Sequence, residues 1–341
     1  MLETIWFALW GLLWAVYLIL DGFDLGMGTL LPFVTKNDTE RRILFNAAGP
    51  YWDGNEVWLI TAGGVTFAAF PKAYAVMFSA LYAPLLILLF ALIFRAASFE
   101  LRSKIDSPRW RSLCDATQFL GSFIPALLLG VAFANLFMGI PIDQNGVYHG
   151  NILKLLSLYG LAGGVFFVVM FAVHGAIWLS MKSTGELRER ALNTAKGLWP
   201  ILLGLALLFL LLTGFYTELY HNFIACPPLL VVPILAVVAL ITTFFMLQGR
   251  ALLGAWMSNA LFILAVTFFG VIGMFPGLII SSLDPAWSIT AFNGASSALT
   301  LKIMLGVTLC LIPVVIIYQI WTYITFSHPV TEEHLEDNHA Y

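Results

Sequence analysis

Acidic side chains interrupt two long apolar stretches near the start of this chain. The first stretch contains DGFDLGMG, where Asp21 and Asp24 stand three residues apart and share one face of a helix. The second begins with GPYWDGNEVW, which places Asp53 and Glu56 on one face within its first two turns. A charge at the centre of a membrane costs at least about 2.5 kcal/mol. Carboxylates at such positions suit the passage of protons inward through trapped water, and as neighbours they titrate as a set.

A structural role is the alternative for these four acids. Asp53 and Glu56 would then stabilise a helix N-terminus through the helix dipole. Asp21 and Asp24 would cap a broken helix. Capping does not require two acids halfway into a span, so the sequence favours proton transfer for Asp21 and Asp24.

Two further charges flank the next pair of apolar stretches. Arg95 ends one stretch and Asp115 begins the following one. An ion pair between them, or between Arg95 and Asp24, is enough to explain both residues. The functional alternative makes Arg95 an electrostatic anchor for an acidic group of a partner or cofactor.

His174, in VVMFAVHGAIW, is the only histidine inside an apolar stretch. Haem ligation is one hypothesis, because imidazole is a common axial ligand. No second histidine lies at similar depth, and a lone helical histidine is more often hydrogen-bonded to a neighbour. The three cysteines show no CxxC spacing and are expected to be inert: Cys114, Cys226 and Cys310. We expect no metal site in this chain.

The elements that must position these residues follow from composition. Sixty per cent of the 341 residues are apolar and only 10% are charged, whereas soluble proteins have roughly 45–50% and about 25%. These values exclude a soluble domain, a disordered chain, a disulfide scaffold and a nucleic-acid-binding surface. The first apolar run has no signal-peptide features. The chain is therefore predicted to be an all-α integral membrane protein.

Nine stretches are long enough to span a bilayer, which takes roughly 20 apolar residues per helix. They are predicted at about 4–31, 50–70, 73–97, 115–137, 155–181, 197–219, 227–248, 253–276 and 301–326. The second and third are separated only by Phe70 and Pro71, which predict a tight turn. If that turn were a kink, the count would be eight.

The distribution of basic residues favours nine spans. With nine, the loops after the first, third, fifth and seventh spans hold 13 of the 16 Lys and Arg. The opposite side keeps Lys72, Lys154 and Lys302. The positive-inside rule then places the N-terminus outside and the C-terminus in the cytoplasm. Residues 1–326 form a single polytopic membrane domain, and residues 327–341 are expected to be a polar, acidic cytoplasmic tail.

Several motifs resemble subunit II of the cytochrome bd-type quinol oxidases. They are DGFDLGMG at 21–28, NDTERR at 37–42, GPYWDGNEVWLITAGG at 49–64, FRAASFELRSK at 94–104, GSFIPALLLGVAFANL at 121–136 and MFPGLIISSLDPAWSITAFNGASSALTLKIM at 274–304. The resemblance extends over nearly the whole chain. The connection near 220–227 is shorter than in some members of the family.

The resemblance implies a respiratory terminal oxidase of a prokaryotic cytoplasmic membrane that oxidises quinol and reduces dioxygen to water. Subunit I, the partner, would bind two b-type haems, one d-type haem and the quinol, and a small single-helix subunit is an open question. Subunit II would be haem-free, with two four-helix bundles and one peripheral helix.

The resemblance also implies roles for individual residues. Trp52 and Asp53 fall in a block implicated in proton uptake at the subunit interface. Asp24, Arg95 and Asp115 fall at positions associated with keeping the haem centre of subunit I formed. Asp21 is expected to be a relay partner beside Asp24, whereas the position of Glu56 is not always acidic in the family.

Two other classes remain as alternatives. A proton-coupled secondary transporter would use the same acids as a coupling site, although no two corresponding spans show the Gly or Pro interruption typical of such proteins. An autonomous b-type cytochrome would depend on His174 alone.

Overall fold

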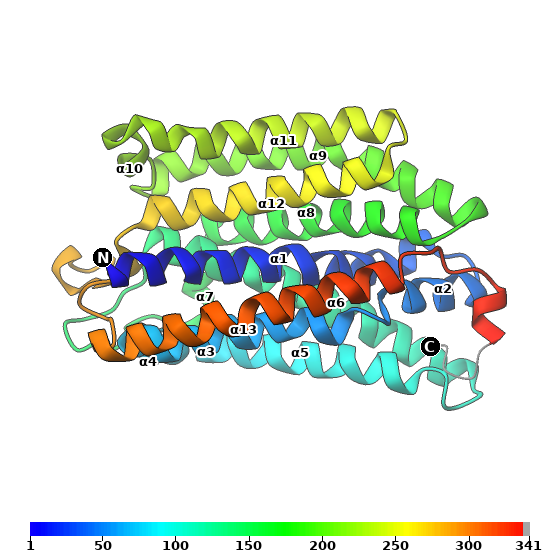
Figure 1. Cartoon of the computed structure of the whole chain (residues 1–341), viewed down its shortest axis with the longest axis horizontal. Coiled ribbons are helices and arrows are strands. Elements are labelled where there is room, and N and C mark those ends of the chain that lie inside the picture. Colours follow the sequence, from blue (N-terminus) through cyan, green and yellow to red (C-terminus); the bar gives the residue numbers. More distant parts are fainter. Residues whose placement is uncertain (337–341) are drawn as a thin grey trace.

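The chain folds into a bundle of long helices. The structure is a computed structural model that describes residues 1–336. Within this part, eight helical segments are long and apolar enough to cross a membrane. They are α1 (Leu2–Val34), α5 (Tyr82–Leu101), α6 (Pro108–Met138), α8 (Leu158–Lys182), α9 (Gly185–Tyr216), Pro227–Gln248 with α11 (Val231–Gln248), α12 (Leu252–Met274) and α13 (Ala298–Thr325). They run side by side along the long axis in Figure 1. The chain is thus an all-α, multi-pass membrane protein.

Shorter elements connect these helices. They are α2 (Asp38–Ala48), α3 (Trp52–Ala69), α4 (Pro71–Ala80), α7 (Ile152–Leu155), α10 (Tyr220–Ala225), the 3₁₀ turns Pro227–Leu230, Pro285–Trp287 and Glu333–Glu336, and the antiparallel strands β1 (Gly277–Ile279) and β2 (Ile289–Thr290). The predicted span at 50–70 forms α3. This helix has 18 residues and is not among the eight apolar segments.

The chain reverses direction between α3 and α5. The ring of Trp52, at the start of α3, stacks on Phe99 near the end of α5, with centroids 5.1 Å apart. The two helices are therefore antiparallel, and the alternative of one kinked helix through Pro71 is wrong. The predicted span at 73–97 is two helices, α4 and α5, which meet at Leu81. Pro84 has no N–H to donate to the carbonyl of Ala80, which explains the break.

The central helix is α1, which packs against α3, α6, α8 and α12. Its closest approach is to α8, where glycine is required on both helices. A Cβ on Gly26 would lie 1.8 Å from the carbonyl oxygen of Phe171, and one on Gly175 would lie 2.4 Å from the backbone nitrogen of Met27. In contrast, the most apolar part of α13 has none of its residues buried within this chain. The helix α13 therefore lies at the periphery.

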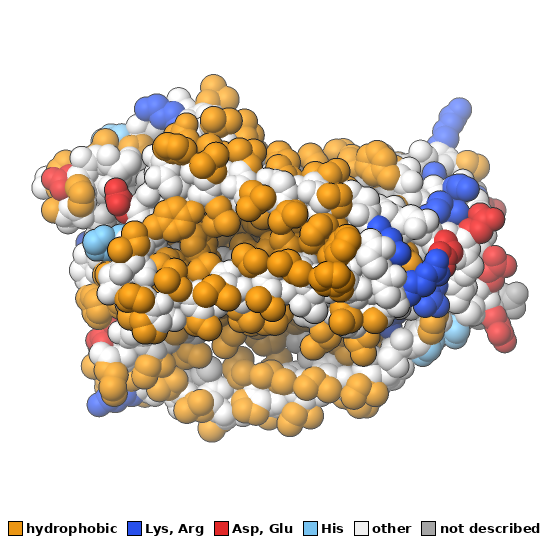
Figure 2. Space-filling view, turned by 90° about the horizontal axis from the view of Figure 1, so that it is seen from above, with side chains coloured by type: hydrophobic (Ala, Val, Ile, Leu, Met, Phe, Trp, Pro, Cys, Tyr) orange, Lys and Arg blue, Asp and Glu red, His pale blue; other side chains and the backbone are white. Residues whose placement is uncertain are grey.

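The two ends of the bundle differ in charge. Figure 2 shows apolar side chains along the length of the molecule and most of the visible charges at the end that carries α2. The segment after α13 folds back onto this end. The backbone N–H of Val330 donates to the carbonyl of Lys182, and the carbonyl of Leu335 accepts from Arg42. The described part of the predicted tail is therefore held against the bundle, whereas 337–341 lie outside the described residues.

Candidate functional site

A single buried arginine faces three carboxylates in the interior of the bundle. Arg95 Nη2 lies 2.8 Å from Asp21 Oδ1 and 4.0 Å from Asp24 Oδ2, and Arg95 Nη1 lies 3.3 Å from Glu56 Oε1. The side chains of Arg95, Asp21 and Asp24 are fully buried, whereas that of Glu56 is 19% exposed. We refer to these four residues as the acidic cluster.

Three helices bring the acidic cluster together. Asp21 and Asp24 share a face of α1, Glu56 lies in the second turn of α3, and Arg95 comes from α5. The approach of α6 to α5 depends on Gly121, because a Cβ there would lie 2.7 Å from the Cβ of Arg95. The predicted clustering of Asp21, Asp24 and Glu56 is present in the structure.

The acidic cluster has more carboxylates than cations. One guanidinium cannot neutralise three ionised acids, and an excess of buried charge is costly. Asp21 Oδ2 and Asp24 Oδ1 have no protein hydrogen-bond partner. Each of these oxygens can take up a proton or bind water without breaking an existing hydrogen bond, which is what a proton-exchanging site requires.

Residues of α3 and α13 extend the cluster. Asn55 Nδ2 donates to Asp24 Oδ2 at 2.7 Å. Asn55 Oδ1 accepts from Gln319 Nε2 at 3.2 Å and from the Tyr323 hydroxyl at 3.1 Å. None of these three residues was predicted from the sequence. The only available signal was that Asn55 lies within the GPYWDGNEVW block and that Gln319 is a polar residue in an apolar span.

Asp53 does not belong to the buried cluster. It is exposed and lines a cleft of about 790 Å³ between α3 and α13. The cleft is also lined by Trp52, Asn55, Trp58, Thr61, Glu100, Tyr318, Gln319, Thr322 and Tyr323. Glu56 follows Asp53 by three residues on α3, so it stands one helical turn from the cleft residue and in contact with Arg95.

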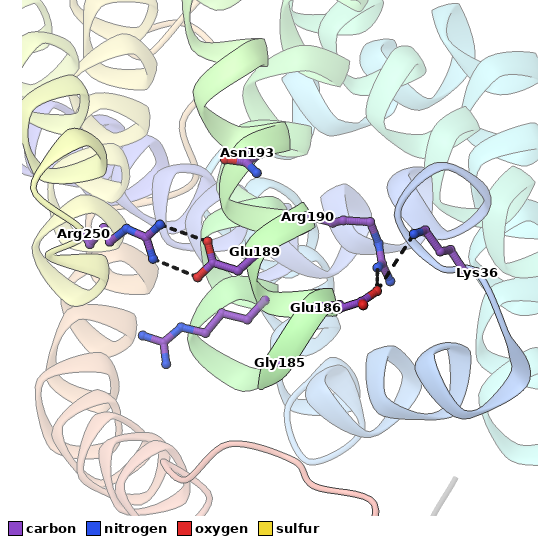
Figure 3. A pocket seen from close by; sticks show the side chains of 8 residues that line it. Lys36, Gly185, Glu186, Glu189, Arg190, Asn193 and Arg250 are labelled. Atoms are coloured by element: carbon purple, nitrogen blue, oxygen red, sulfur yellow. Dashed lines mark hydrogen bonds and ion pairs between the residues drawn. The ribbon is translucent and has the colours of Figure 1, made fainter.

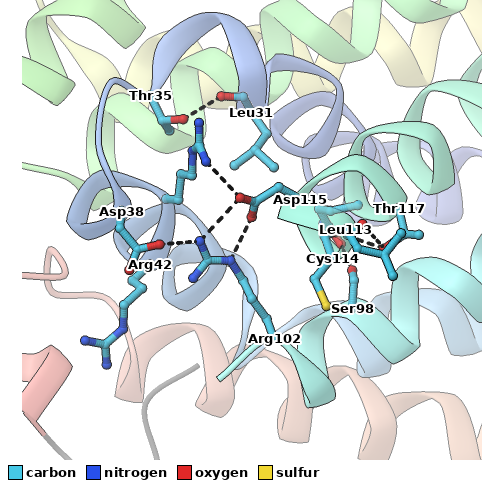
Figure 4. Close-up of polar contacts among 12 residues, drawn as sticks. Leu31, Thr35, Asp38, Arg42, Ser98, Arg102, Leu113, Cys114, Asp115 and Thr117 are labelled. Carbon is cyan, nitrogen blue, oxygen red and sulfur yellow. Dashed lines mark hydrogen bonds and ion pairs between the residues drawn. The ribbon is translucent and has the colours of Figure 1, made fainter. Parts of the chain in front are cut away.

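Asp115 lies in a separate network at the charged end of the bundle, shown in Figure 4. Arg102 Nε donates to Asp115 Oδ1 at 2.7 Å, and Arg41 Nη1 donates to Asp115 Oδ2 at 2.9 Å. Arg102 also pairs with Asp38 at 2.6 Å. The predicted ion pair between Arg95 and Asp115 is therefore wrong, because Arg102 is two turns nearer to this end of α5. The alternative pair with Asp24 is present only at 4.0 Å, and Asp21 is the nearer partner.

His174 is fully buried, and both of its ring nitrogens have neighbours. Nε2 lies 3.2 Å from the carbonyl oxygen of Ile19, and Nδ1 lies 3.0 Å from Asn259 Nδ2. A carbonyl only accepts, so Nε2 carries the hydrogen and Nδ1 accepts from the amide. The ring also stacks on Trp256, with centroids 5.3 Å apart. These contacts favour a hydrogen-bonded core histidine, and the residue does not fit a haem ligand.

Comparison with known proteins decides the family. A family model described as cytochrome bd terminal oxidase subunit II matches residues 2–326. The chain belongs to the cytochrome bd oxidase subunit II family.

Individual relatives agree with this assignment. The chain is 36% identical to subunit 2 of the cytochrome bd-I ubiquinol oxidase of Escherichia coli K12, over 99% of this chain and 97% of the relative. It is also 36% identical to subunit 2 of the cytochrome bd ubiquinol oxidase of Bacillus subtilis 168, over 97% and 98%. The solved bd oxidase from Geobacillus thermodenitrificans has a chain with the same fold, with a TM-score of 0.74, 17% identity and coverage of 95% and 98%.

Membership in the bd oxidase subunit II family sets aside the transporter and the autonomous cytochrome as classes. A second hollow of this subunit is lined by side chains that form ion pairs with one another. It is therefore a weaker candidate for the functional site than the acidic cluster. That hollow, of about 860 Å³, lies at the start of α9. Figure 3 shows Arg250 paired with Glu189, and Glu186 paired with Arg190 and Lys36. These pairs account for five of the six charged residues that line the hollow, and Arg188 is the sixth.

Among the residues that the structure describes, no group of three or more His, Cys, Asp or Glu is placed to hold a metal ion. Cys114 is buried, and Cys226 and Cys310 are exposed free thiols. The acidic cluster and the exposed Asp53 are therefore the candidate functional groups among the described residues.

Proposed function

We propose that this chain is the haem-free second subunit of a quinol:dioxygen oxidoreductase, and that Asp53, Glu56, Asp21 and Asp24 take up protons from the cytoplasm for oxygen reduction in subunit I. The observation that carries this proposal is the acidic cluster, in which three carboxylates share the charge of Arg95. The E. coli and B. subtilis relatives are named as ubiquinol oxidase subunits, which supports a quinol as the electron donor.

The proposed orientation follows from charge. The end of the bundle with α2 carries Arg41, Arg102 and the tail segment, in line with the positive-inside rule. Counting α3 as a membrane-embedded helix beside the eight apolar segments gives nine spans. The N-terminus then lies outside, the C-terminus lies in the cytoplasm of a prokaryotic cell, and the peripheral helix is α13. Two four-helix bundles would contain the other eight helices.

The proposed partner surface is formed by α3 and α13. Large apolar side chains on this side, such as Ile60 and Trp321, are exposed, and α13 is not covered by its own chain. Asp53 lies in the cleft between the same two helices. Because an ionisable side chain facing lipid is costly, we infer that subunit I, rather than lipid, covers this cleft.

The carboxylates then form a graded series from exposed to buried. Asp53 is exposed in the cleft, Glu56 is partly buried against Arg95, and Asp21 and Asp24 are fully buried. Each carboxylate oxygen without a hydrogen-bond partner can hold a proton. The positive charge of Arg95 offsets part of the negative charge of the three carboxylates around it. Because moving one charge across 100 mV costs about 2.3 kcal/mol, proton uptake from one side stores energy.

Trp52, Arg95 and Asp115 are proposed to support the partner's haems indirectly. Trp52 braces the start of α3 against Phe99, Arg95 holds the cluster, and Asp115 ties α6 to α2 and α5 through its arginines. We assign two b-type haems and one d-type haem to subunit I, where they would supply electron transfer and oxygen activation. His174 is not a candidate ligand, because both ring nitrogens are engaged.

The test is Asp53→Asn in the assembled complex. We expect quinol-driven oxygen consumption to fall about tenfold or more, because a proton-accepting group is removed, while haem absorption stays unchanged. Asp106→Asn is the matched control, since its side chain is exposed in a loop outside the cleft. Unchanged turnover of the Asp53 variant in a complex with full haem content would remove Asp53 from the proton path.

A further inference from the structure

The orientation of Asp24 is determined by a chain of hydrogen bonds that starts on Trp58. The indole N–H of Trp58 donates to Gln319 Oε1 at 2.9 Å. An indole nitrogen can only donate, so the oxygen of the Gln319 side chain must face Trp58. The amide nitrogen of Gln319 must then face Asn55, where it donates to Asn55 Oδ1.

The other end of the chain gives the same orientation independently. Asn55 Nδ2 donates to the carbonyl oxygen of Leu20 at 3.1 Å as well as to Asp24 Oδ2. A carbonyl oxygen can only accept, so the nitrogen of the Asn55 side chain must lie on this side. The amide of Asn55 is completely buried and makes four hydrogen bonds, which is the most that it can make.

These constraints assign the two oxygens of Asp24. Oδ2 accepts from Asn55 in either protonation state, whereas Oδ1 has no protein partner. A proton on Asp24 therefore resides on Oδ1. An amide group does not take up and release protons as a carboxyl group does. Trp58, Gln319 and Asn55 therefore position Asp24 and do not themselves transfer protons to it.

We propose that Trp58, Gln319 and Asn55 form a chain of hydrogen bonds, which we call the positioning relay, through which α13 sets the proton affinity of Asp24. The proton itself is carried on Oδ1 of Asp24 and does not pass along this chain. This inference rests on the proposed function. Gln319 and Tyr323 of α13 hydrogen-bond to Asn55, which in turn donates to Asp24. They thereby connect Asp24 to a helix whose most apolar part is not buried within this chain. A partner that displaces α13 would thereby change how tightly Asp24 holds its proton.

Other groups act on the same carboxylate and stay in place in the test. They are Asp21 of α1, Glu56 of α3, Arg95 of α5, Tyr323 of α13 and Tyr51 before α3. The relay differs from these because it acts on Oδ2 through a direct hydrogen bond. Loss of one hydrogen bond to a charged group changes an equilibrium constant by about tenfold.

The experiment uses the assembled complex and the infrared carbonyl band of protonated Asp24, identified by its loss in Asp24→Asn. In Asn55→Leu the carbonyl at Oδ2 loses its donor, so we expect the band to move to higher frequency. We also expect the alkaline limb of the oxidase pH profile to move upward by about one pH unit. Gln319→Met and Trp58→Phe should shift the band in the same direction by less, and they serve if Asn55→Leu does not assemble. Phe215→Leu, an exposed change on α9 outside the proposed partner surface, should leave the band in place.

An unchanged band in Asn55→Leu, or in both Gln319→Met and Trp58→Phe, overturns the relay. If Asp24→Asn itself retains full turnover and removes no band, the proton-carrying role of Asp24 fails instead. The failure of the inference and the failure of the proposed function are therefore distinguishable.

Discussion

Arg95 Nη2 lies 2.8 Å from Asp21 Oδ1, and neither side chain has any exposed surface. The same guanidinium lies within 4.0 Å of Asp24 and Glu56. Arg95 is thus the electrostatic centre of a site that otherwise contains only acids and neutral polar groups.

The first prediction concerns the loss of the buried cation. Arg95→Gln leaves three carboxylates without their shared counterion, and breaking such a buried pair costs about 3–5 kcal/mol. We expect a lower thermal unfolding midpoint of the purified complex and reduced haem content. Adding Asp21→Asn removes one of the stranded charges, so the double variant should recover part of the loss. Simple additivity of the two changes would contradict this account.

The second prediction concerns the crossing of α1 and α8. Gly26→Ala forces a methyl group against the carbonyl oxygen of Phe171, only 1.8 Å from the ideal Cβ position. Overpacking of this kind costs about 1–3 kcal/mol, and more where backbone must move. Gly204→Ala in α9 is the control, because nothing lies within 4 Å of its Cβ position. Thermal unfolding should show a loss for the first variant and none for the second.

Hydropathy accounts for most of the helices. The predicted span at 253–276 corresponds closely to α12, and that at 155–181 to α8, since long apolar runs leave few alternatives. The break at Leu81 was not predicted, because an apolar run continues through Pro84. The predicted turn at Phe70 and Pro71 is present, since α3 ends at Ala69 and α4 begins at Pro71.

The site was only partly predictable for a physical reason. Asp21 and Asp24 share a face through local helical geometry, so their proximity follows from spacing alone. Whether Arg95 or Arg102 pairs with Asp115 depends on the axial offset between α5 and α6. A shift of about two helical turns along α5 exchanges the two arginines, and the sequence does not give this offset. The link from Asn55 to Gln319 joins residues 264 positions apart, and no local pattern encodes that contact.

The third prediction concerns His174. His174→Ala removes a side chain that bonds Ile19 and Asn259 and stacks on Trp256. We expect a loss of stability of about 1–3 kcal/mol, because buried polar groups lose their partners. The visible absorption of the haems should stay unchanged in the assembled complex. Loss of a haem signal in this variant would reverse the haem-free assignment.

The last prediction concerns pH at the charged end of the bundle. Partial burial of Asp38 opposes its ionisation, but the hydrogen bond and charge of Arg102 outweigh burial and hold the pKa of Asp38 below its usual value of 3.8. A carboxyl with a lowered pKa contributes stability that is fully present above its unfolded value and is lost as pH falls through the folded value. The contribution should therefore be complete above about pH 4 and disappear below it. Because the Asp38 side chain is 49% exposed, the effect should be modest and should shrink at high salt.

Unfolding of the purified complex at several pH values checks this directly. Asp38→Asn should be less stable than the unmodified protein at neutral pH, and the difference should vanish as the pH falls below about 4. Asp106→Asn should show a smaller difference, because Asp106 makes only one exposed ion pair with Arg111. If the difference in stability between Asp38→Asn and the unmodified protein persists unchanged into strong acid, Asp38 acts through packing and not through its charge interaction with Arg102.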